Sequence, residues 1–361
     1  MDDDALRRAA AANHRSWFRR LAHARGGRVE RAGGVDLIVG GADGTIAFPR
    51  SSRVEPAVAR IRALRLHEAS CWSLRPDAVL GTRLVARGFG WGWQPHWMAL
   101  DLAHLPDDPA EHKVTTRSGP IPRGVPYGDD VDPPATVHLV VRTSGRVVGH
   151  VCVNPWRGVA GIYSMGVARA HRRRGVGMAL TIAAARAGLE RGCTHAVLNA
   201  TDEGAALYGA AGFRSLGYGQ TWWYGARTEP SAEQIALAEA IGFGDTAALA
   251  RLDPSPKVLA EPLPGGTSPI RLAVVTGRIA SAEWILDRAP GLAQARFEPF
   301  GGTLLHLAVE WNRPDVIALA LARGVDPSLT DRSFESTPLG WTEHFGLPEL
   351  AALLRPPTRP S

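Results

Sequence analysis

Lysine, cysteine and long apolar runs are scarce in this chain of 361 residues. Only Lys113 and Lys257 are lysines, although Lys and Arg together number 41, so arginine carries nearly all the positive charge. The three cysteines, Cys71, Cys152 and Cys193, are far apart and form no CxxC pair, which argues against a disulfide framework and against a zinc site. No apolar run approaches the roughly 18 residues that span a bilayer, so we expect no membrane segment.

The charge pattern gives little sign of a nucleic-acid partner. The formal net charge is +6, but the densest basic run is only His171–Arg174, and a nucleic-acid-binding arm usually has a longer one. The first residues, Met1–Asp4, are acidic and lack the basic and apolar regions of a secretion signal. Hydrophobic residues make up 45% of the chain, which is enough for packed cores. We therefore expect a cytoplasmic protein whose function involves no nucleic acid, membrane or metal.

The C-terminal third of the chain repeats itself. Thr267, Thr303 and Thr337 stand 36 and 34 residues apart, and each precedes a short apolar segment with helical character. A threonine caps such a helix through its hydroxyl, and a proline in the first turn costs no hydrogen bond. The pattern resembles the ankyrin repeat in its period and in its T-P-L-H-x-A signature. The resemblance covers residues 231–356 and implies an all-α ankyrin-repeat array in a domain over 229–358.

The middle third reads as alternating strands and helices. Two β-branched runs around a Thr-Ser-Gly turn predict a hairpin, and a third strand is followed by a glycine-rich turn and an alanine-rich helix. A fourth strand, a short helix and an aromatic strand complete the pattern. In chain order, the predicted elements are strands 136–141, 147–153 and 161–167, helix 176–190, strand 195–200, helix 204–211 and strand 216–224.

The first hundred residues partly echo the middle third. They predict helices over 4–24 and 54–66, and strands over 35–39, 45–48, 71–74 and 96–102. Leu80–Phe89 and Ala206–Phe213 are both helical segments that end in Gly-Phe before an aromatic strand. This likeness favours a tandem duplication with a degraded first copy, and coincidence is the alternative. Residues 105–135 are rich in Pro, Asp and Gly and are expected to form a linker or loop.

The segment Val167–Leu180 combines a strand end, a basic glycine-rich turn and a helix start. The first N–H groups of a helix have no acceptor within the helix, and the helix dipole places partial positive charge there. Glycines allow a ligand to approach the backbone closely. These features predict an anion site suited to a pyrophosphate.

This segment resembles the acetyl-CoA-binding motif of the Gcn5-related N-acetyltransferase (GNAT) family. The family motif, Gln/Arg-x-x-Gly-x-Gly/Ala, is matched by Arg172-x-x-Gly175-x-Gly177, and the preceding strand by Met165-Gly166-Val167. The resemblance implies an α/β (α+β) GNAT fold with acetyl-CoA as cosubstrate over 136–226. Together with the echo at 1–104, it implies a tandem arrangement followed by the ankyrin array.

The resemblance also implies roles for individual residues. Strand residues would contact the pantetheine arm and the acetyl group, and loop amides would hold the pyrophosphate. The second cofactor signature of the family, Asn-x-x-Ala-x-x-Leu-Tyr, is only partly kept, because Thr201 stands in place of Asn and Gly204 in place of Ala. The expected cofactor residues are Met165, Gly166, Val167, Arg172, Arg173, Arg174, Gly175, Val176, Gly177, Met178, Asn199 and Thr201.

Tyr208 is the expected catalytic residue. The resemblance places the departing thiol beside this tyrosine, and a phenol can protonate a leaving thiolate. Packing between helix and sheet is its alternative role. The predicted strand before the loop carries no carboxylate, which leaves His150 as a candidate base with a suitable pKa range, or as a structural residue.

The acceptor is expected to be a primary amine of a small molecule, such as a polyamine, an aminoglycoside or another amine antibiotic. The acidic residues Asp129 and Asp130 and the aromatic Trp222 are candidates for binding a cationic amine, or are a solvated loop and a core residue. Two alternatives stay open: a protein acceptor recruited through the ankyrin repeats, and a non-catalytic acyl-CoA sensor. The repeats could also pack on the transferase region or on a second copy.

Overall fold

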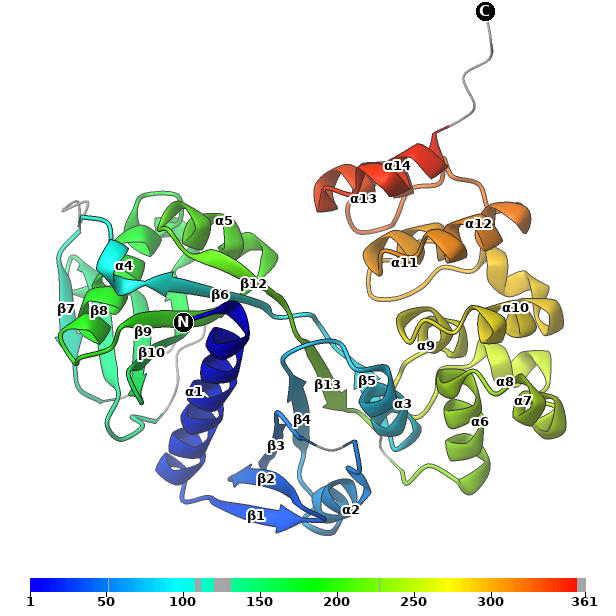
Figure 1. Ribbon diagram of the computed structural model, residues 1–361, viewed down its shortest axis with the longest axis horizontal. Helices are drawn as coiled ribbons and strands as arrows, with labels where there is room; N and C mark the ends of the chain where they lie inside the picture. The colour runs from blue at the N-terminus through cyan, green and yellow to red at the C-terminus, as the bar shows by residue number, and fades with distance from the viewer. Residues whose placement is uncertain (51, 108–111, 120–130, 227, 356–361) are drawn as a thin grey trace, which may run out of the picture. The chain divides into compact units, whose positions relative to one another are not determined.

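The computed structural model describes residues 1–50, 52–107, 112–119, 131–226 and 228–355. The chain forms two compact units, one of Met1–Pro76 with Gly92–Trp223, the other of Asp77–Trp91 with Tyr224–Ser361 (Figure 1). Among the described residues, no helix has the length and apolarity needed to cross a bilayer. The first unit ends at Trp223, and the second unit resumes at Tyr224.

The first unit contains two β-sheets and the helices that cover them. Its helices are α1 (Asp3–Ala24), α2 (Glu55–Ala63), α4 (Val176–Leu189) and α5 (Asp202–Ala210). Its strands are β1 (Arg28–Ala32), β2 (Val35–Gly40), β3 (Asp43–Ala47), β4 (Glu68–Ser73), β6 (His96–Asp101), β7 (Val114–Arg117), β8 (Val137–Thr143), β9 (Arg146–Trp156), β10 (Val159–Val167), β11 (His195–Ala200), β12 (Arg214–Tyr218) and β13 (Gln220–Tyr224).

The two sheets repeat one topology. Strands β8, β9 and β10 form an antiparallel meander, and β10 then pairs in parallel with β11 across helix α4. Strands β1, β2 and β3 form the same meander, and β3 pairs in parallel with β4 across helix α2. A parallel pair with an intervening helix is the expected crossover unit. The agreement supports the echo that the sequence shows between its first and middle thirds.

The two halves exchange their last strands. Strand β6, from the first half, lies between β11 and β12 in the second sheet and is antiparallel to both. Strand β13, from the second half, is antiparallel to β4 in the first sheet. Each sheet therefore contains a strand that its own half does not supply.

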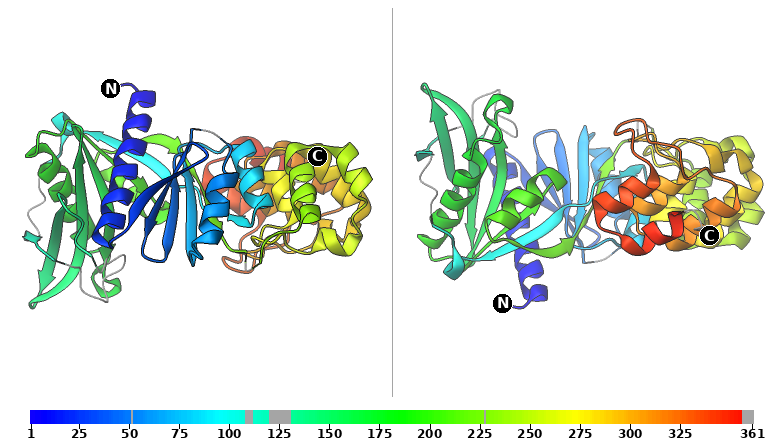
Figure 2. Two further views of the ribbon diagram at one scale, coloured as in Figure 1. Left: turned by 90° about the horizontal axis from the view of Figure 1, so that it is seen from below. Right: turned by 90° about the horizontal axis from the view of Figure 1, so that it is seen from above.

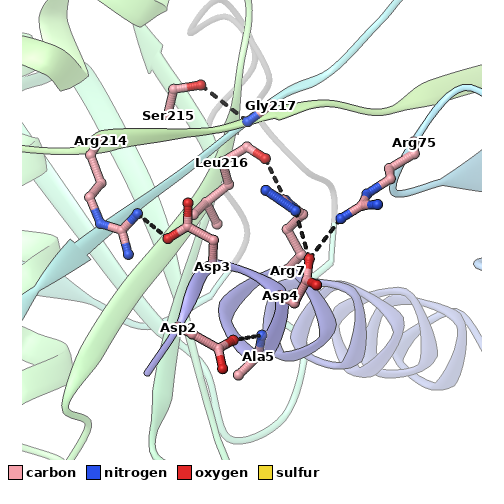
Figure 3. A network of polar contacts seen from close by, with 10 residues as sticks. All are labelled: Asp2, Asp3, Asp4, Ala5, Arg7, Arg75, Arg214, Ser215, Leu216 and Gly217. Carbon is pink, nitrogen blue, oxygen red and sulfur yellow. Dashed lines mark hydrogen bonds and ion pairs between the residues drawn. The ribbon is translucent and has the colours of Figure 1, made fainter.

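Helix α1 packs against strands of both sheets (Figures 1 and 2). Asp2 caps it, since its carboxylate accepts from Ala5 N at 2.7 Å, and acidic residues in the first turn suit the helix dipole. The start of α1 is anchored to β12: Arg7 Nε donates to the carbonyl of Leu216 at 2.6 Å, and Asp3 pairs with Arg214 (Figure 3). These contacts hold the start of the helix at β12.

Three details differ from the sequence expectations. The expected linker contains β7, which pairs with β8 at the edge of the second sheet. The expected strand 216–224 is two strands in different sheets, separated at Gly219. A Cβ at that glycine would lie 2.5 Å from Ser73 O and from Trp97 Nε1, so the chain can cross between the sheets there only without a side chain. Strand β1 was not predicted.

The second unit is helical apart from one short strand. It contains α3 (Ala78–Ala86), β5 (Phe89–Trp91), α6 (Ala232–Phe243), α7 (Thr246–Leu252), α8 (Pro256–Ala260), α9 (Pro269–Val275), α10 (Ile279–Arg288), α11 (Leu304–Glu310), α12 (Pro314–Ala322), α13 (Pro338–Phe345) and α14 (Pro348–Leu354). Most of the later helices follow one another as packed pairs, and successive pairs are in contact (Figures 1 and 2).

The segment 77–91 packs into this helical unit. Helix α3 lies against α6, where Arg87 Nη1 and Glu239 Oε1 are 2.8 Å apart. Gly242 allows the contact, because a Cβ there would lie 2.3 Å from Thr82 Oγ1. Trp91 N donates to Thr267 Oγ1 at 3.0 Å, which ties the segment to the next helix pair as well.

Candidate active site

Strand β10 is bent by a bulge. Its register with β9 shifts between Tyr163 and Gly166, and Ser164 has a positive φ of 50° at this point. Its parallel pairing with β11 covers only Val159–Gly161. The two strands separate beyond Gly161, as expected when one of a pair bends.

A cavity of about 680 Å³ opens where β10 and β11 separate. Residues 162–167 of β10, the loop before α4, the start of α4, the end of β11 and helix α5 all contribute to its wall. Every residue that lines it belongs to the first unit.

Helix α4 begins at this cavity with uncapped amides. Its N-cap is Gly175, which has a φ of 78° and no side chain to accept from the first turn. The first bond of the helix joins Ala179 N to Gly175 O at 3.0 Å, so the amides of Val176, Gly177 and Met178 have no acceptor within the helix. The helix dipole adds partial positive charge at the same place. These backbone donors make the start of α4 suited to binding an anion, and we call it the anion site.

Two features shape the anion site. A Cβ on Gly177 would lie 3.0 Å from Leu207 Cδ2, so glycine lets α4 and α5 approach each other closely. Arg172 holds the loop, because it donates to Val167 O and pairs with Glu203, both at 3.3 Å. Arg172 and its neighbour Arg173 line the cavity and add positive charge.

Most of the sequence-predicted cofactor residues line the cavity. Those that do are Met165, Gly166, Val167, Arg172, Arg173, Gly175, Gly177, Met178, Asn199 and Thr201. Arg174 and Val176 are not among the lining residues. Val176 is buried, and the carbonyl of Arg174 accepts from His112 Nε2 at 2.5 Å.

Helix α5 brings Tyr208 to the cavity. The tyrosine is almost fully buried, lines the cavity and packs edge-on against Phe213 at 5.9 Å. Thr201, which replaces the asparagine of the family signature, caps α5 by accepting from Gly204 N at 3.2 Å. Its oxygen is therefore committed to the helix, whereas Asn199 lies on β11 and lines the cavity.

Two of the candidates for base or acceptor roles do not line the cavity. His150 is fully buried on β9 and does not line the cavity. Trp222 is fully buried on β13, opposite Cys71, and does not line it either. These positions argue against His150 as the base and against Trp222 as an acceptor contact, because both side chains are enclosed in the core. Asp129 and Asp130 fall outside the described residues.

The sequence did not predict the aromatic end of the cavity. Its rings are His14 and Trp17 from α1, Trp72 from β4, Trp93 before β6, and Tyr163 from β10. His14 lies 4.9 Å from Trp72 and from Tyr163, Trp17 stacks on Tyr163 at 5.2 Å, and Trp72 meets Trp93 at 5.8 Å. A sequence signal for this surface is the pair of polar residues, Asn13 and His14, that follows the alanine run Ala9–Ala12 of α1 and is buried in the structure.

Burial controls the two titratable groups of the aromatic end. It lowers the pKa of His14 from 6.5 to about 3, so the ring is neutral near pH 7. Burial raises the pKa of Tyr163 well above its usual value of 10, so its hydroxyl keeps the proton. Neither side chain is a strong base.

Comparison with known families decides what this cavity belongs to. The model of the acetyltransferase (GNAT) family matches residues 97–213. Residues 97–213 are a GNAT acetyltransferase domain. The chain is therefore an acyltransferase. The GNAT domain begins in the exchanged strand β6 and ends before β12, so the match spans the cavity wall from β10 to α5.

Solved structures that match the chain are distant. A GCN5-related N-acetyltransferase from Kribbella flavida is 19% identical with a TM-score of 0.46, over 62% of this chain and 96% of that chain. A GCN5-related N-acetyltransferase from Sphaerobacter thermophilus is 17% identical with a TM-score of 0.37, over 52% and 79%. A tandem GNAT protein from the clavulanic acid biosynthesis pathway is 15% identical with a TM-score of 0.39, over 62% and 95%. No curated protein matches. The assignment of the GNAT domain rests on the family model.

Proposed function

We propose that this protein transfers an acetyl group from acetyl-CoA to a primary amine of a small molecule, by direct attack in a ternary complex. The observation that carries the proposal is one cavity with two different ends. One end has the uncapped start of α4 with Gly175 and Arg172, and the other has the aromatic rings. Two substrates can meet between them.

The anion site fits the pyrophosphate of acetyl-CoA. Backbone amides of the first turn of α4 donate to phosphate oxygens, Gly175 and Gly177 leave room for them, and Arg172 and Arg173 supply charge. The bulge at Ser164 turns edge groups of β10 toward the cavity, where the pantetheine arm would extend. Among the described residues, no cluster of His, Cys, Asp and Glu is arranged to hold a metal ion.

Tyr208 serves as the general acid in this proposal. The amine nitrogen attacks the thioester carbonyl carbon, the C–N bond forms and the C–S bond breaks. The departing thiolate takes the phenolic proton of Tyr208, which solvent replaces after the amine nitrogen has lost its own proton. A positioned acid contributes about 10² to 10⁴ in rate. The place of Tyr208 in the cavity wall supports this role.

Only the second half is equipped to bind the cosubstrate. The loop of the first half that corresponds to the anion site, residues 48–54, contains no glycine. Helix α2 after it has Glu55 and Pro56 in its first turn, which places a negative charge there and removes an N–H group. We therefore assign the first half, residues 1–104, as a degenerate GNAT-like copy that supplies walls and a strand, and 136–226 as the acetyl-CoA-binding half, joined by 105–135.

We further propose that the C-terminal region, 229–358, is an ankyrin-repeat array. Its packed helix pairs start at capping residues Ser268, Thr303 and Thr337. His306 supports the assignment, because its Nδ1 lies 3.0 Å from Thr303 N while its Nε2 donates to Ser336 O at 2.9 Å, next to the following cap. One ring thus links two successive repeats.

A protein acceptor is the second candidate. Phe334, in the loop between α12 and α13, exposes 65% of its surface at the end of a cluster with Phe300 and Trp341. An exposed aromatic on a repeat loop is suited to binding a protein.

A thiol-release assay with acetyl-CoA and a panel of amines tests the proposal. We expect release that depends on a small amine. Release only with a protein or peptide amine would favour the second candidate. Tight acetyl-CoA binding without turnover on any amine would contradict enzyme function at this site and favour an acyl-CoA sensor.

A further inference from the structure

Most of the rings at the aromatic end of the cavity are buried, and hydrogen bonds hold two of them. Trp17, Trp72 and Tyr163 are each more than nine-tenths buried. Trp72 Nε1 donates to Ser70 Oγ at 3.2 Å, and the Tyr163 hydroxyl donates to Asn13 Oδ1 at 2.8 Å. Trp93 is more exposed, at 39%, and forms the rim. The rings therefore present fixed flat faces.

None of the described residues at this end of the cavity carries a carboxylate. Among the described residues that line the cavity, the only carboxylate is that of Glu203. It lies on α5 and pairs with Arg172 at the anion site, at 3.3 Å. A polycationic acceptor such as a polyamine would find no carboxylate of the described lining near the rings.

His14 contributes a polar ring whose Nδ1, unlike Tyr163 Oη and Trp72 Nε1, has no partner among the described residues. This nitrogen is buried. A buried polar atom without a partner is costly, and a ligand that satisfies it recovers that cost. Since the His14 ring is neutral, its unprotonated nitrogen can accept a hydrogen bond from an N–H group, but the ring does not form an ion pair.

The energies favour an uncharged acceptor. Removing an ammonium ion from water costs several kcal/mol, whereas a cation–π contact in a dry site returns about 2 kcal/mol. No described group of the lining is placed to take a proton from an ammonium at this end. An amine that is already neutral avoids both problems.

We propose that the acceptor is an aromatic amine of low basicity, held flat among these rings beside the neutral ring of His14. The proposal rests on the proposed acetyl transfer. An aniline-type nitrogen is uncharged at neutral pH because its lone pair is delocalised into the ring. It forms the C–N bond as the C–S bond breaks, loses one proton to solvent, and the leaving sulfur gains one from Tyr208.

The test compares aniline with cyclohexylamine, which has the same size but is an ammonium ion at pH 7, and with spermidine. The readout is the initial rate of N-acetyl product by mass spectrometry with the full chain. We expect kcat/KM to be about tenfold or more higher for aniline, because cyclohexylamine must be removed from water as an ammonium ion before it can bind among the rings. Equal or higher kcat/KM for cyclohexylamine or spermidine would overturn the aromatic acceptor and leave acetyl transfer intact. Absence of product from every amine would overturn both.

A pair of tryptophan variants locates the binding surface. Trp93→Ala removes a rim ring, and Trp223→Ala removes a tryptophan of similar exposure, 41%, that does not line the cavity. We expect KM for aniline to rise about threefold to tenfold in Trp93→Ala and to stay unchanged in Trp223→Ala. His14→Phe should raise KM by a similar factor with kcat largely kept. Unchanged KM in both Trp93→Ala and His14→Phe would contradict binding at these rings.

Discussion

The hydroxyl group of Tyr163 donates a hydrogen bond of 2.8 Å to Oδ1 of Asn13. Asn13 in turn donates to the carbonyls of Asn154 and Val159, at 3.1 Å and 2.8 Å, so it joins α1 to β9 and β10. Gly161 makes room for this network, because a Cβ there would lie 2.0 Å from Asn13 Oδ1. A helix outside the matched family region thus fixes one wall of the cavity.

This network predicts an order of stabilities. Tyr163→Phe removes one donor, but Asn154 Nδ2 still donates to Asn13 Oδ1 at 3.0 Å, so we expect a loss of about 1 kcal/mol in the free energy of unfolding. Asn13→Leu removes this acceptor from the buried Tyr163 hydroxyl and the Asn154 amide, and we expect a loss of about 3 kcal/mol in the free energy of unfolding. Urea unfolding measures both. A Tyr163→Phe loss as large as that of Asn13→Leu would contradict the network as described.

The pKa of His14 predicts a pH-dependent stability. Burial lowers this pKa from 6.5 to about 3, so below pH 6.5 the unfolded chain binds a proton that the folded chain does not. The free energy of unfolding should therefore fall by about 1.4 kcal/mol per pH unit between pH 6.5 and 3 through this residue. The free energy of unfolding of the wild type minus that of His14→Phe should decrease steadily as pH falls through this range. A difference that is constant over this range would show that His14 is not buried as a neutral ring.

Gly175 and Gly192 form a matched pair for testing the anion site. Both have positive φ, 78° at the start of α4 and 76° after its end. An alanine at either position should cost about 1 kcal/mol in stability. Only Gly175→Ala should also weaken acetyl-CoA binding, by about tenfold, because its Cβ and strained backbone disturb the first-turn amides. Calorimetric titration measures the affinity for acetyl-CoA. Equal losses of affinity in the two variants would contradict binding of the pyrophosphate at the start of α4.

Phenylalanine variants of Tyr208 and Tyr218 distinguish a catalytic role of Tyr208 from a packing role. Tyr208→Phe keeps the ring and removes the proposed acid, so kcat should fall by about 10²-fold or more with KM for acetyl-CoA little changed. Tyr218 lies on β12, is 48% exposed and does not line the cavity, and Tyr218→Phe should keep full kcat. Steady-state kinetics with one amine decides this. An unchanged kcat in Tyr208→Phe would leave the tyrosine with a packing role only.

The packing of α3 predicts the effect of truncation. A chain ending at Ala226 lacks α6, against which α3 packs through residues such as Thr82 and Arg87. We expect this variant to be less stable by several degrees in melting temperature, or insoluble, since burial of an apolar helix face is lost. A chain ending at Leu329 keeps α6 and removes only the last helix pair, so its transferase half should melt as in the full chain. Equal melting of all three chains would contradict the packing of α3 in the second unit.

The sequence predicted the elements that local chemistry specifies. The hairpin of β8 and β9, the helix that starts after Gly175, and helix α1 follow from apolar periodicity and from glycine and acidic caps. The residues of the anion site between Arg172 and Met178 lie in one continuous segment, so their spacing in the sequence predicts that they lie together.

The parts that the sequence left out depend on distant contacts. The break at Gly219 and the exchange of β6 and β13 arise from pairing between strands that are far apart in the sequence, and no local pattern marks a swap. Most of the aromatic end of the cavity was not predicted for the same reason, because α1 and β4 reach the cavity only through the arrangement of the two sheets. Trp222 was chosen for its residue type, but strand alternation turns it into the core.

The most direct test of acetyl transfer at this cavity is the stoichiometry of the reaction. Acetyl-CoA is incubated with the full chain and with each amine of the panel, aniline included, and free CoA thiol and N-acetylated amine are measured in the same samples over time. Because each transfer releases one CoA thiol and forms one N-acetylated amine, we expect both products to rise together in a one-to-one ratio with at least one amine. Thiol that accumulates without acetylated amine, or no thiol although acetyl-CoA binds, would contradict acetyl transfer at this cavity.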